Sequence, residues 1–344
     1  MELTIIALLL AVFVGVNVGG SNLGVSFGPA VGSGVISVRK AAGLMSFFAI
    51  LGGVLIGPNV IETLGKGIIP QGGMTTTAAL GVMLFTGLGL AIGNYAKVSV
   101  STSKIAVISV AALGFALSNI NLTVLTNILI WWVFSGLIAF WLSAMIGRYL
   151  FDSISNLVSF GEEKGKYLII GVACYAAFSA GANNVANIIA PVIGSGQLTM
   201  TTGLIISLFA LTIGAFWIGP RTTETIGFEI TDINVEVAIL IQAMTATVIT
   251  VMSILGIPAS LAHIAVLTTI GIAWGRATNR VEVSRALGLK EMRAKDVLVR
   301  KKDSLNLFNY ETAEKILLIW ILSPVLIGII SLLVFFPAVH YGII

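Results

Sequence analysis

One stretch of sequence occurs twice in this chain, and the two copies keep a constant separation. Residues 19–34 read GGSNLGVSFGPAVGSG, and residues 181–196 read GANNVANIIAPVIGSG. Adding 162 to the number of Asn22, Pro29 or Ser33 leads to a residue of the same type in the second copy. Self-similarity at a fixed spacing predicts that the chain is built from two copies of one structural unit.

A second pair of segments keeps the same spacing. Residues 57–65 (GPNVIETLG) correspond to residues 219–227 (GPRTTETIG), so Glu62 corresponds to Glu224. Further on, the spacing is 159 between Ser101 and Ser260, and it becomes 188 between the Trp-containing segments at 132–135 and 320–323. The larger spacing predicts an insertion in the second half, which the basic segment 276–303 supplies.

Long apolar runs connect these motifs. The 344 residues are 57% hydrophobic and only 10% charged, a composition typical of a chain folded in lipid. About 20 apolar residues form a helix that spans a bilayer, so we predict an all-α polytopic membrane protein. The expected helical segments are 3–17, 41–57, 75–95, 105–117, 122–147, 167–180, 203–219, 234–256, 259–275 and 314–338.

The distribution of basic residues predicts that the two repeats are inverted. Arg39 and Lys40 follow the first glycine-rich block, whereas the corresponding loop 197–201 is uncharged. The basic insertion likewise corresponds to an uncharged loop in the first half. Basic loops stay on the cytoplasmic side, so the two halves need opposite orientations, with about five helical segments in each and broken helices or re-entrant hairpins at the centre.

The repeat, its insertion and the charge distribution predict the organisation of the chain. Residues 1–147 form the first transmembrane repeat, 148–165 a cytoplasmic linker, and 166–344 the second repeat, which carries a basic cytoplasmic loop at 276–311. Both termini then lie outside a multi-pass protein of the cell membrane. For the basic loop we prefer the role of a topology determinant, the alternative being an amphipathic helix on anionic lipid.

The two glycine-rich blocks interrupt runs that otherwise predict membrane helices. These interrupted segments carry the groups that could bind an anion. Backbone N–H groups at a helix break, together with Asn and Ser side chains, form an oxyanion site without a full positive charge. Ser101, Thr102 and Ser103 stand where a helix would begin, and Ser260 follows Pro258. We expect each hydroxyl segment to face the Asn block of its own half. The alternative interpretation is that these small residues serve only close helix packing.

These motifs resemble those of the inorganic phosphate transporters, including the sulfate permease branch of that family. The family signature G-A-N-D-V-A-N-A is similar to residues 181–188 (GANNVANI), its P-V-S-T-T-H segment is similar to residues 258–263 (PASLAH), and its G-x-x-x-x-E-T-x-G element is similar to the segments that contain Glu62 and Glu224. The resemblance covers almost the whole chain and implies an inverted-repeat secondary transporter of a tetrahedral oxyanion.

The chain departs from the family pattern at the signature carboxylates. Asn22 and Asn184 stand where phosphate carriers of this family have Asp, and Val18 stands where another Asp is common. Sulfate carries no proton and is repelled by a carboxylate, whereas an amide donates to it. The substitutions favour sulfate over phosphate and weaken the case for Na⁺ as the coupling ion, although carbonyl and hydroxyl oxygens leave a Na⁺ site open.

Import of a dianion against an inside-negative potential needs coupled cations, because each elementary charge is worth about 2.3 kcal/mol per 100 mV. Protons are the favoured coupling ion. Glu62 and Glu224 are the candidate carriers, since carboxyl groups near lipid exchange protons more readily near neutral pH. Local ion pairs with Lys66 and Arg221 are an equally weighted alternative.

Four further residues are weaker candidates for the site: Asn17, Asn187, Lys104 and His263. Lys104 and His263 occupy corresponding places after the hydroxyl segments, where a cation could neutralise sulfate and a histidine could titrate with it. For Lys104 we favour the alternative, a side chain that snorkels to the cytoplasmic surface. For His263 a satisfied interfacial position stays equally open.

The sequence therefore predicts a secondary active transporter that imports sulfate by alternating access, with a sodium-coupled phosphate symporter as the runner-up and an anion channel third. The expected substrate-binding residues are Ser21, Asn22, Ser101, Thr102, Ser103, Asn183, Asn184 and Ser260. We expect no enzymatic activity, no metal or cofactor, and no nucleic-acid partner. The partners are the oxyanion and the bilayer, and a homodimer is an assembly that such carriers permit.

Overall fold

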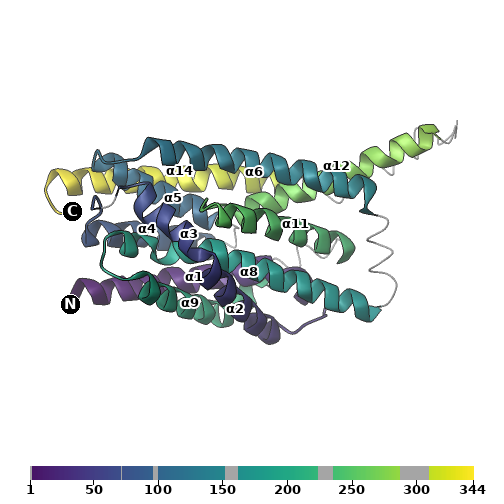
Figure 1. Cartoon of the computed structure of the whole chain (residues 1–344), viewed down its shortest axis with the longest axis horizontal. Coiled ribbons are helices and arrows are strands. Elements are labelled where there is room, and N and C mark those ends of the chain that lie inside the picture. The colour runs from purple at the N-terminus through teal and green to yellow at the C-terminus, as the bar shows by residue number, and fades with distance from the viewer. Residues whose placement is uncertain (1, 71, 96–99, 152–161, 224–234, 287–309) are drawn as a thin grey trace.

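In the computed structural model the chain is a bundle of long helices that lie along one axis (Figure 1). The structure describes residues 2–70, 72–95, 100–151, 162–223, 235–286 and 310–344, and these contain no β-strand. The helices of the first half are α1 (Glu2–Gly32), α2 (Val38–Leu55), α3 (Gly57–Glu62), the π-helical turn η1 (Thr63–Gly67), α4 (Thr76–Tyr95), α5 (Thr102–Ala116) and α6 (Leu122–Tyr149). Those of the second half are α8 (Glu162–Gly194), α9 (Met200–Trp217), α11 (Val235–Ile254), α12 (Leu261–Ala286) and α14 (Tyr310–His340).

The described helices confirm the predicted polytopic, all-α class. Eight of them are long and apolar enough to cross a membrane, and two shorter apolar helices accompany them at Thr102–Ala116 and Leu261–Arg276. The basic segment predicted as a loop is helical at its start, because α12 continues to Ala286. Residues 287–309 lie outside the described part of the chain.

The prediction that the two glycine-rich blocks break their helices is wrong. Helices α1 and α8 continue through the blocks to Gly32 and Gly194, with Pro29 and Pro191 inside their last turns. Each proline removes one backbone hydrogen bond, the one from its own nitrogen to the carbonyl four residues earlier, and the helix ends within a turn after it. Each helix then stops at a glycine with positive φ, Gly34 at 73° or Gly196 at 77°, the residue that tolerates this C-terminal conformation.

The breaks occur instead at the tips of two helical hairpins. Helices α4 and α5 form one hairpin and α11 and α12 the other, and α5 and α12 extend from the tips toward opposite ends of the molecule (Figure 1). Side chains bond the open backbone at the second tip: Trp132 Nε1 donates to the carbonyl oxygen of Pro258 (2.7 Å), and the N–H of Ala259 donates to Asn183 Oδ1 (2.9 Å). Broken helices or re-entrant hairpins were the two predicted arrangements, and the structure shows re-entrant hairpins.

Close helix contacts repeat between the two halves with the spacing seen in the sequence. A Cβ on Gly19 would overlap the carbonyl oxygen of Leu211, and a Cβ on Gly181 would overlap that of Ala49. Adding 162 to Gly19 gives Gly181, and adding 162 to Ala49 gives Leu211. The small residues of the blocks therefore let α1 pack closely on α9 and α8 on α2, as expected where backbones approach.

The two chain termini lie at one end of the bundle, and two helix ends that carry basic residues lie toward the other. Helices α1 and α8 run in opposite directions, and both termini lie at one end (Figure 1). The start of α8 and the end of α6 lie toward the other end (Figure 1), and they carry Lys166 and Arg148. This is the relation that an inverted repeat requires. The orientation in a membrane and the domain limits at 147 and 166 stay predictions.

Candidate functional site

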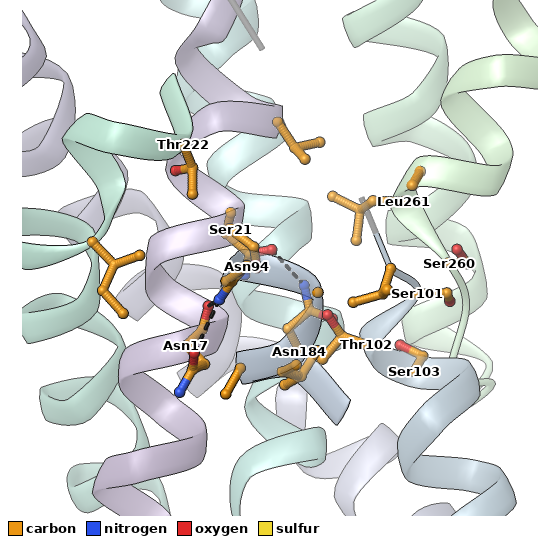
Figure 2. A pocket seen from close by; sticks show the side chains of 18 of the residues that line it. Asn17, Ser21, Asn94, Ser101, Thr102, Ser103, Asn184, Thr222, Ser260 and Leu261 are labelled. Atoms are coloured by element: carbon orange, nitrogen blue, oxygen red, sulfur yellow. Dashed lines mark hydrogen bonds between the residues drawn. The ribbon is translucent and has the colours of Figure 1, made fainter. Parts of the chain in front are cut away.

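A cavity of about 470 Å³ lies where the two hairpin tips meet α1 and α8. Figure 2 shows that polar side chains from both halves of the chain point toward it. The residues that line it are Asn17, Ser21, Asn22, Val25, Leu90, Ala91, Gly93, Asn94, Tyr95, Val100, Ser101, Thr102, Ser103, Asn184, Ile218, Arg221, Thr222, Ala259, Ser260, Leu261 and Ala262. None of these described residues is Asp or Glu, so the cavity wall offers neutral donors and one cation.

The sequence-predicted residues fall into three groups. Eight of them line the cavity: Asn17, Ser21, Asn22, Ser101, Thr102, Ser103, Asn184 and Ser260. Asn183, Asn187, Lys104 and His263 do not line it but contact residues that do. Glu62 lies away from the cavity on an exposed face of α3, and Glu224 lies outside the described residues.

Asn184 connects the two glycine-rich blocks at the cavity wall. Its Nδ2 donates to Asn22 Oδ1 at 3.0 Å, so the two residues that are equivalent in the repeat touch each other. Its Oδ1 accepts from Asn183 Nδ2 (3.1 Å) and Asn187 Nδ2 (2.9 Å). These bonds hold the side-chain amides of Asn22 and Asn184 in place, because buried polar groups have few other partners to bond.

Asn22 keeps its own amide donor for the cavity. The side chain is 4% exposed, and its Nδ2 has no hydrogen-bond partner within the described protein. A buried N–H group without a partner costs about 1–3 kcal/mol. A ligand oxygen in the cavity would remove that cost.

Asn183 holds the two hairpin tips together behind the cavity wall. Its Nδ2 donates to Ser103 Oγ (3.1 Å) and to the carbonyl oxygen of Ala259 (2.7 Å), and Asn187 Nδ2 also donates to Ser103 Oγ (3.1 Å). The hydroxyl segment of the first half thus faces the Asn block of the second half. The expectation that each segment faces its own block is wrong for Ser103, because α5 crosses over to pack on α8.

Asn94, at the end of α4, was not identified from the sequence. Its Nδ2 donates to the carbonyl oxygen (3.2 Å) and to Oδ1 (3.0 Å) of Asn17, and the Asn17 amide donates to the carbonyl oxygen of Phe13 (2.9 Å). Asn94 has no counterpart in the repeated motifs. An amide beside Gly93, near the end of an apolar run, was the available signal.

Arg221 is predicted from the sequence only as a possible ion-pair partner of Glu224, and Thr222 is not predicted at all, yet both line the cavity. Thr222 Oγ1 donates to the carbonyl oxygens of Gly20 (2.5 Å) and Gly219 (3.0 Å), which fixes this segment against α1. Arg221 therefore brings a guanidinium to the mouth of the cavity. A guanidinium is always charged and suits tetrahedral oxyanions.

The structure overturns the expectation that Lys104 snorkels to the surface. Lys104 is only 8% exposed, since Ser101 caps α5 and so begins it in the middle of the molecule (Lys104 N to Ser101 Oγ, 3.4 Å). Its Nζ lies 3.1 Å from His263 Nδ1 and 5.7 Å from the ring centre of Trp132. His263 begins α12 in the same way, because its N–H donates to Ser260 Oγ at 3.3 Å.

Glu62 has an exposed side chain with no ion pair or hydrogen bond among the described residues. A local pair with Lys66, the alternative from the sequence, is therefore absent within that part of the chain. Its role as a proton carrier stays a prediction.

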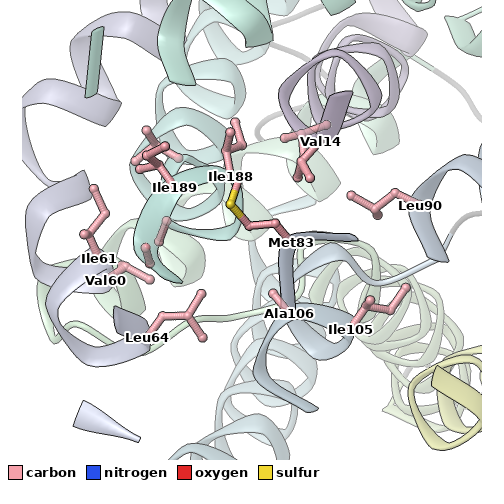
Figure 3. Close-up of a cluster of buried hydrophobic side chains, with 14 of the residues drawn as sticks. Val14, Val60, Ile61, Leu64, Met83, Leu90, Ile105, Ala106, Ile188 and Ile189 are labelled. Atoms are coloured by element: carbon pink, nitrogen blue, oxygen red, sulfur yellow. The ribbon is translucent and has the colours of Figure 1, made fainter. Parts of the chain in front are cut away.

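A large apolar core backs the cavity. Figure 3 shows Leu90 and Ile105 beside Val14, Met83 and Ile188, and Leu90 belongs both to this core and to the cavity lining. Apolar side chains packed behind the polar wall exclude water from that side of it. Hydrogen bonds made inside such a site are electrostatically stronger than in water.

Comparisons with known proteins agree with this architecture. A sequence model of the phosphate transporter family matches residues 18–164 and 161–331. The sulfate permease CysP of Bacillus subtilis (strain 168) is 29% identical over 348 aligned residues, which cover all of this chain and 90% of that protein. The human sodium-dependent phosphate transporter 1 is 26% identical over 222 residues, which cover 60% of this chain and 32% of that protein.

A solved structure of a protein named the sodium-dependent phosphate transporter has a similar fold. The TM-score is 0.71 at 22% sequence identity, and the match covers 97% of this chain and 98% of that one. Both family and fold are therefore those of transporters.

Proposed function

The chain belongs to the phosphate transporter family, and on that basis we propose that it imports sulfate by proton-coupled, alternating-access transport across the cell membrane. The proposal rests above all on the chemistry of the cavity wall. Amides and hydroxyls line it, and no described lining residue is a carboxylate.

The donor set suits an anion that carries no proton. Sulfate needs only donors, and the buried, unpartnered Nδ2 of Asn22 lies in the wall beside Asn184. Phosphate near neutral pH still carries a proton, for which a carboxylate is a good acceptor. A carboxylate would also repel the dianion, so the exchange of Asp for Asn favours sulfate.

The guanidinium of Arg221 supports the same substrate class. Full charges near a cavity attract an oppositely charged ligand and raise its local concentration. Arg221 is exposed at the mouth, so we assign it to capture of the dianion on the way to the Asn pair.

Proton coupling follows from the charge of the substrate. Two protons per sulfate cancel its charge, and three let the membrane potential drive uptake. Among the described residues, the cavity wall has none of the carboxylate oxygens that a hard cation such as Na⁺ prefers. The named function of the human relative makes sodium-coupled phosphate transport the second candidate.

Uptake of labelled sulfate into proteoliposomes tests the proposal. Phosphate, selenate, thiosulfate and molybdate serve as competitors, and the uptake is repeated with proton or sodium gradients. We expect saturable sulfate uptake driven by an inward proton gradient. Strong phosphate uptake with little sulfate uptake would contradict the substrate, sodium dependence without a response to pH would contradict the coupling, and non-saturable flux would favour a channel.

The substitutions Asn22→Asp and Asn184→Asp test the role of the amides. Each is expected to weaken sulfate binding, because it replaces a donor by a repelling charge. Asn121→Asp is the matched control, since Asn121 caps α6 far from the cavity by accepting from the N–H of Val124 (3.2 Å), and Asp caps helices equally well. Unchanged affinity in both cavity variants would remove the argument from the amides.

A further inference from the structure

Two basic side chains from opposite halves of the chain meet behind the cavity. Lys104 Nζ and His263 Nδ1 are 3.1 Å apart, and the two residues occupy matching positions in the repeat. Each lies three residues after a serine that caps its helix and lines the cavity, Ser101 or Ser260. The pair therefore sits directly behind the anion site and bridges the two hairpin tips.

The contact fixes how many protons the pair can hold. A lysine ammonium has three donors and no acceptor, so a charged Lys104 requires that His263 Nδ1 be the unprotonated acceptor. Protonation of both groups would place two donors and two like charges in contact, which is unfavourable. In the arrangement seen here the pair therefore carries one proton fewer than two separate basic groups.

A dianion in the adjacent cavity changes that balance. The negative charge of sulfate offsets a second positive charge, so binding of the anion favours uptake of a proton by His263, and the proton favours binding of the anion to the same extent. Lys104 and His263 lie on different hairpins, α5 and α12. A rearrangement that separates the tips would break the contact and so free Nδ1 for the proton.

The arginines nearest to the pair along α6 and α12 lie far from it. On α6, Gly136 is next to His263, and Arg148 is about 18 Å further along that helix. Arg276 is about 20 Å along α12 from His263. The remaining described groups on these helices are Tyr95 of α4 at the cavity, Tyr149 of α6, Lys166, Tyr167, Cys174 and Tyr175 of α8, Glu236 of α11, and His340 of α14.

We propose that Lys104 and His263 form a binding site for one of the protons that cross the membrane with sulfate, an inference that rests on the proposed function. Trp132 supports the site from α6: its ring lies 5.7 Å from Lys104 Nζ, and its Nε1 holds the carbonyl oxygen of Pro258. The pair accounts for one proton per cycle. Glu62 and Glu224 are the candidates for the others.

Two measurements on the same proteoliposomes test this site. One is the steady accumulation of sulfate with the interior one pH unit more alkaline and the membrane potential clamped at zero. The other is sulfate-for-sulfate exchange at equal pH, which needs no net proton movement. Each coupled proton contributes about tenfold to the accumulation ratio per pH unit. We therefore expect His263→Gln to lower accumulation about tenfold and to retain exchange.

Three further variants complete the test. Lys104→Gln is expected to behave like His263→Gln, and the double variant Lys104→His/His263→Lys, which restores the pair in reversed order, is expected to regain accumulation. His340→Gln is the matched control, because His340 is the other histidine of the chain and is exposed near the end of α14. It should leave both measurements unchanged.

Some outcomes would contradict the proton site at Lys104 and His263, and another would contradict the proposed function. Full accumulation in both single variants would overturn the site, and so would loss of exchange together with accumulation, since the pair would then be needed for sulfate movement itself. Should the single variants fail to fold, the reversed pair decides, because a folded reversed pair without accumulation overturns the site. Wild-type vesicles that show no accumulation under a pH gradient would contradict the proposed function instead.

Discussion

Gly19 packs against the carbonyl of Leu211 in the same way that Gly181 packs against the carbonyl of Ala49, yet the polar residues beside these two glycines differ. Ser21 lines the cavity and donates to the carbonyl oxygen of Val18 on its own helix. Asn183, its counterpart 162 residues later, lies behind the wall and holds both hairpin tips. The two halves thus share their backbone packing, but equivalent side chains make different contacts at the site.

Equivalent residues also differ at other positions in and around the site. Lys104 corresponds to His263, and the exposed Asn59, which donates to the carbonyl oxygen of Ile254 (3.0 Å), corresponds to Arg221 at the cavity mouth. In the proposed function the anion is bound in one place between the halves, so equivalent residues of the two halves need not be identical there. The packing contacts have no such asymmetry. Substitutions of equivalent residues should therefore have equal effects in the scaffold and unequal effects in the site.

The largest effects are expected where the helices cross. Gly181→Ala would place a Cβ against the carbonyl of Ala49, and Gly19→Ala would do the same against Leu211. Because neither backbone can move aside, each should cost about 3 kcal/mol of stability, the upper range for overpacking. The measurement is the temperature at which half the purified protein remains monodisperse in detergent. Gly171→Ala on α8 is the control, since a Cβ there meets nothing within 4 Å.

Equal losses in Gly19→Ala and Gly181→Ala would support equivalent packing in the two halves. A variant that is as stable as Gly171→Ala would contradict it for that half.

The next largest effects should separate the two central asparagines. Asn22→Ala removes a donor that has no protein partner and the acceptor of Asn184 Nδ2, so we expect sulfate affinity to fall about tenfold or more with a smaller loss of stability than Asn184→Ala. Asn184→Ala removes the shared acceptor of Asn183 and Asn187, and it should lower both affinity and thermal stability. Equilibrium binding of labelled sulfate and the detergent melt distinguish the two. Equal losses of stability would show that Asn22 is also a structural residue.

A smaller and salt-sensitive effect is expected at the cavity mouth. Arg221→Gln removes the cation of the wall and should weaken sulfate uptake about three- to tenfold, with the difference shrinking as ionic strength rises, because salt screens exposed charges. Asn59→Gln, at the corresponding position of the first half, should leave uptake unchanged. Initial rates at low and high salt measure both. A salt-independent loss in Arg221→Gln would indicate a packing role.

The sequence was sufficient for the scaffold where a helix is uniformly apolar. The segment 75–95 was expected and α4 spans Thr76–Tyr95, and the expected segment 122–147 is α6, Leu122–Tyr149. The expected helix 3–17 instead continues to Gly32. Glycine and asparagine have low helix propensity, but packing of Gly19 against a backbone carbonyl stabilises the helix in a way that no local pattern reveals.

The site was predictable in its residue types but not in its pairings. The repeat placed Asn22, Asn184 and the hydroxyl segments together, and all of these line the cavity. It could not show that Asn22 and Asn184 touch, or that Ser103 belongs to the asparagines of the other half. Lys104 was misjudged because a lysine at a helix start is usually near water. Here the helix starts at the hairpin tip, in the middle of the molecule.

The smallest expected effect concerns Gln197, just beyond the end of α8. Its Oε1 accepts from Thr76 Oγ1 (3.2 Å) and its Nε2 donates to Thr4 Oγ1 (2.6 Å), whereas its counterpart in the first half, Val35, packs against the apolar core. Gln197→Leu should cost about 1 kcal/mol and leave sulfate affinity unchanged, because Gly194 already lies about 15 Å along α8 from Asn184. Adding Thr4→Val and Thr76→Val removes the two hydroxyls that are left without this partner and should recover most of the lost stability in the detergent melt. No recovery would mean that Gln197 acts through its packing, as Val35 does, and the asymmetry of the two halves would then be confined to the cavity and its hairpin tips.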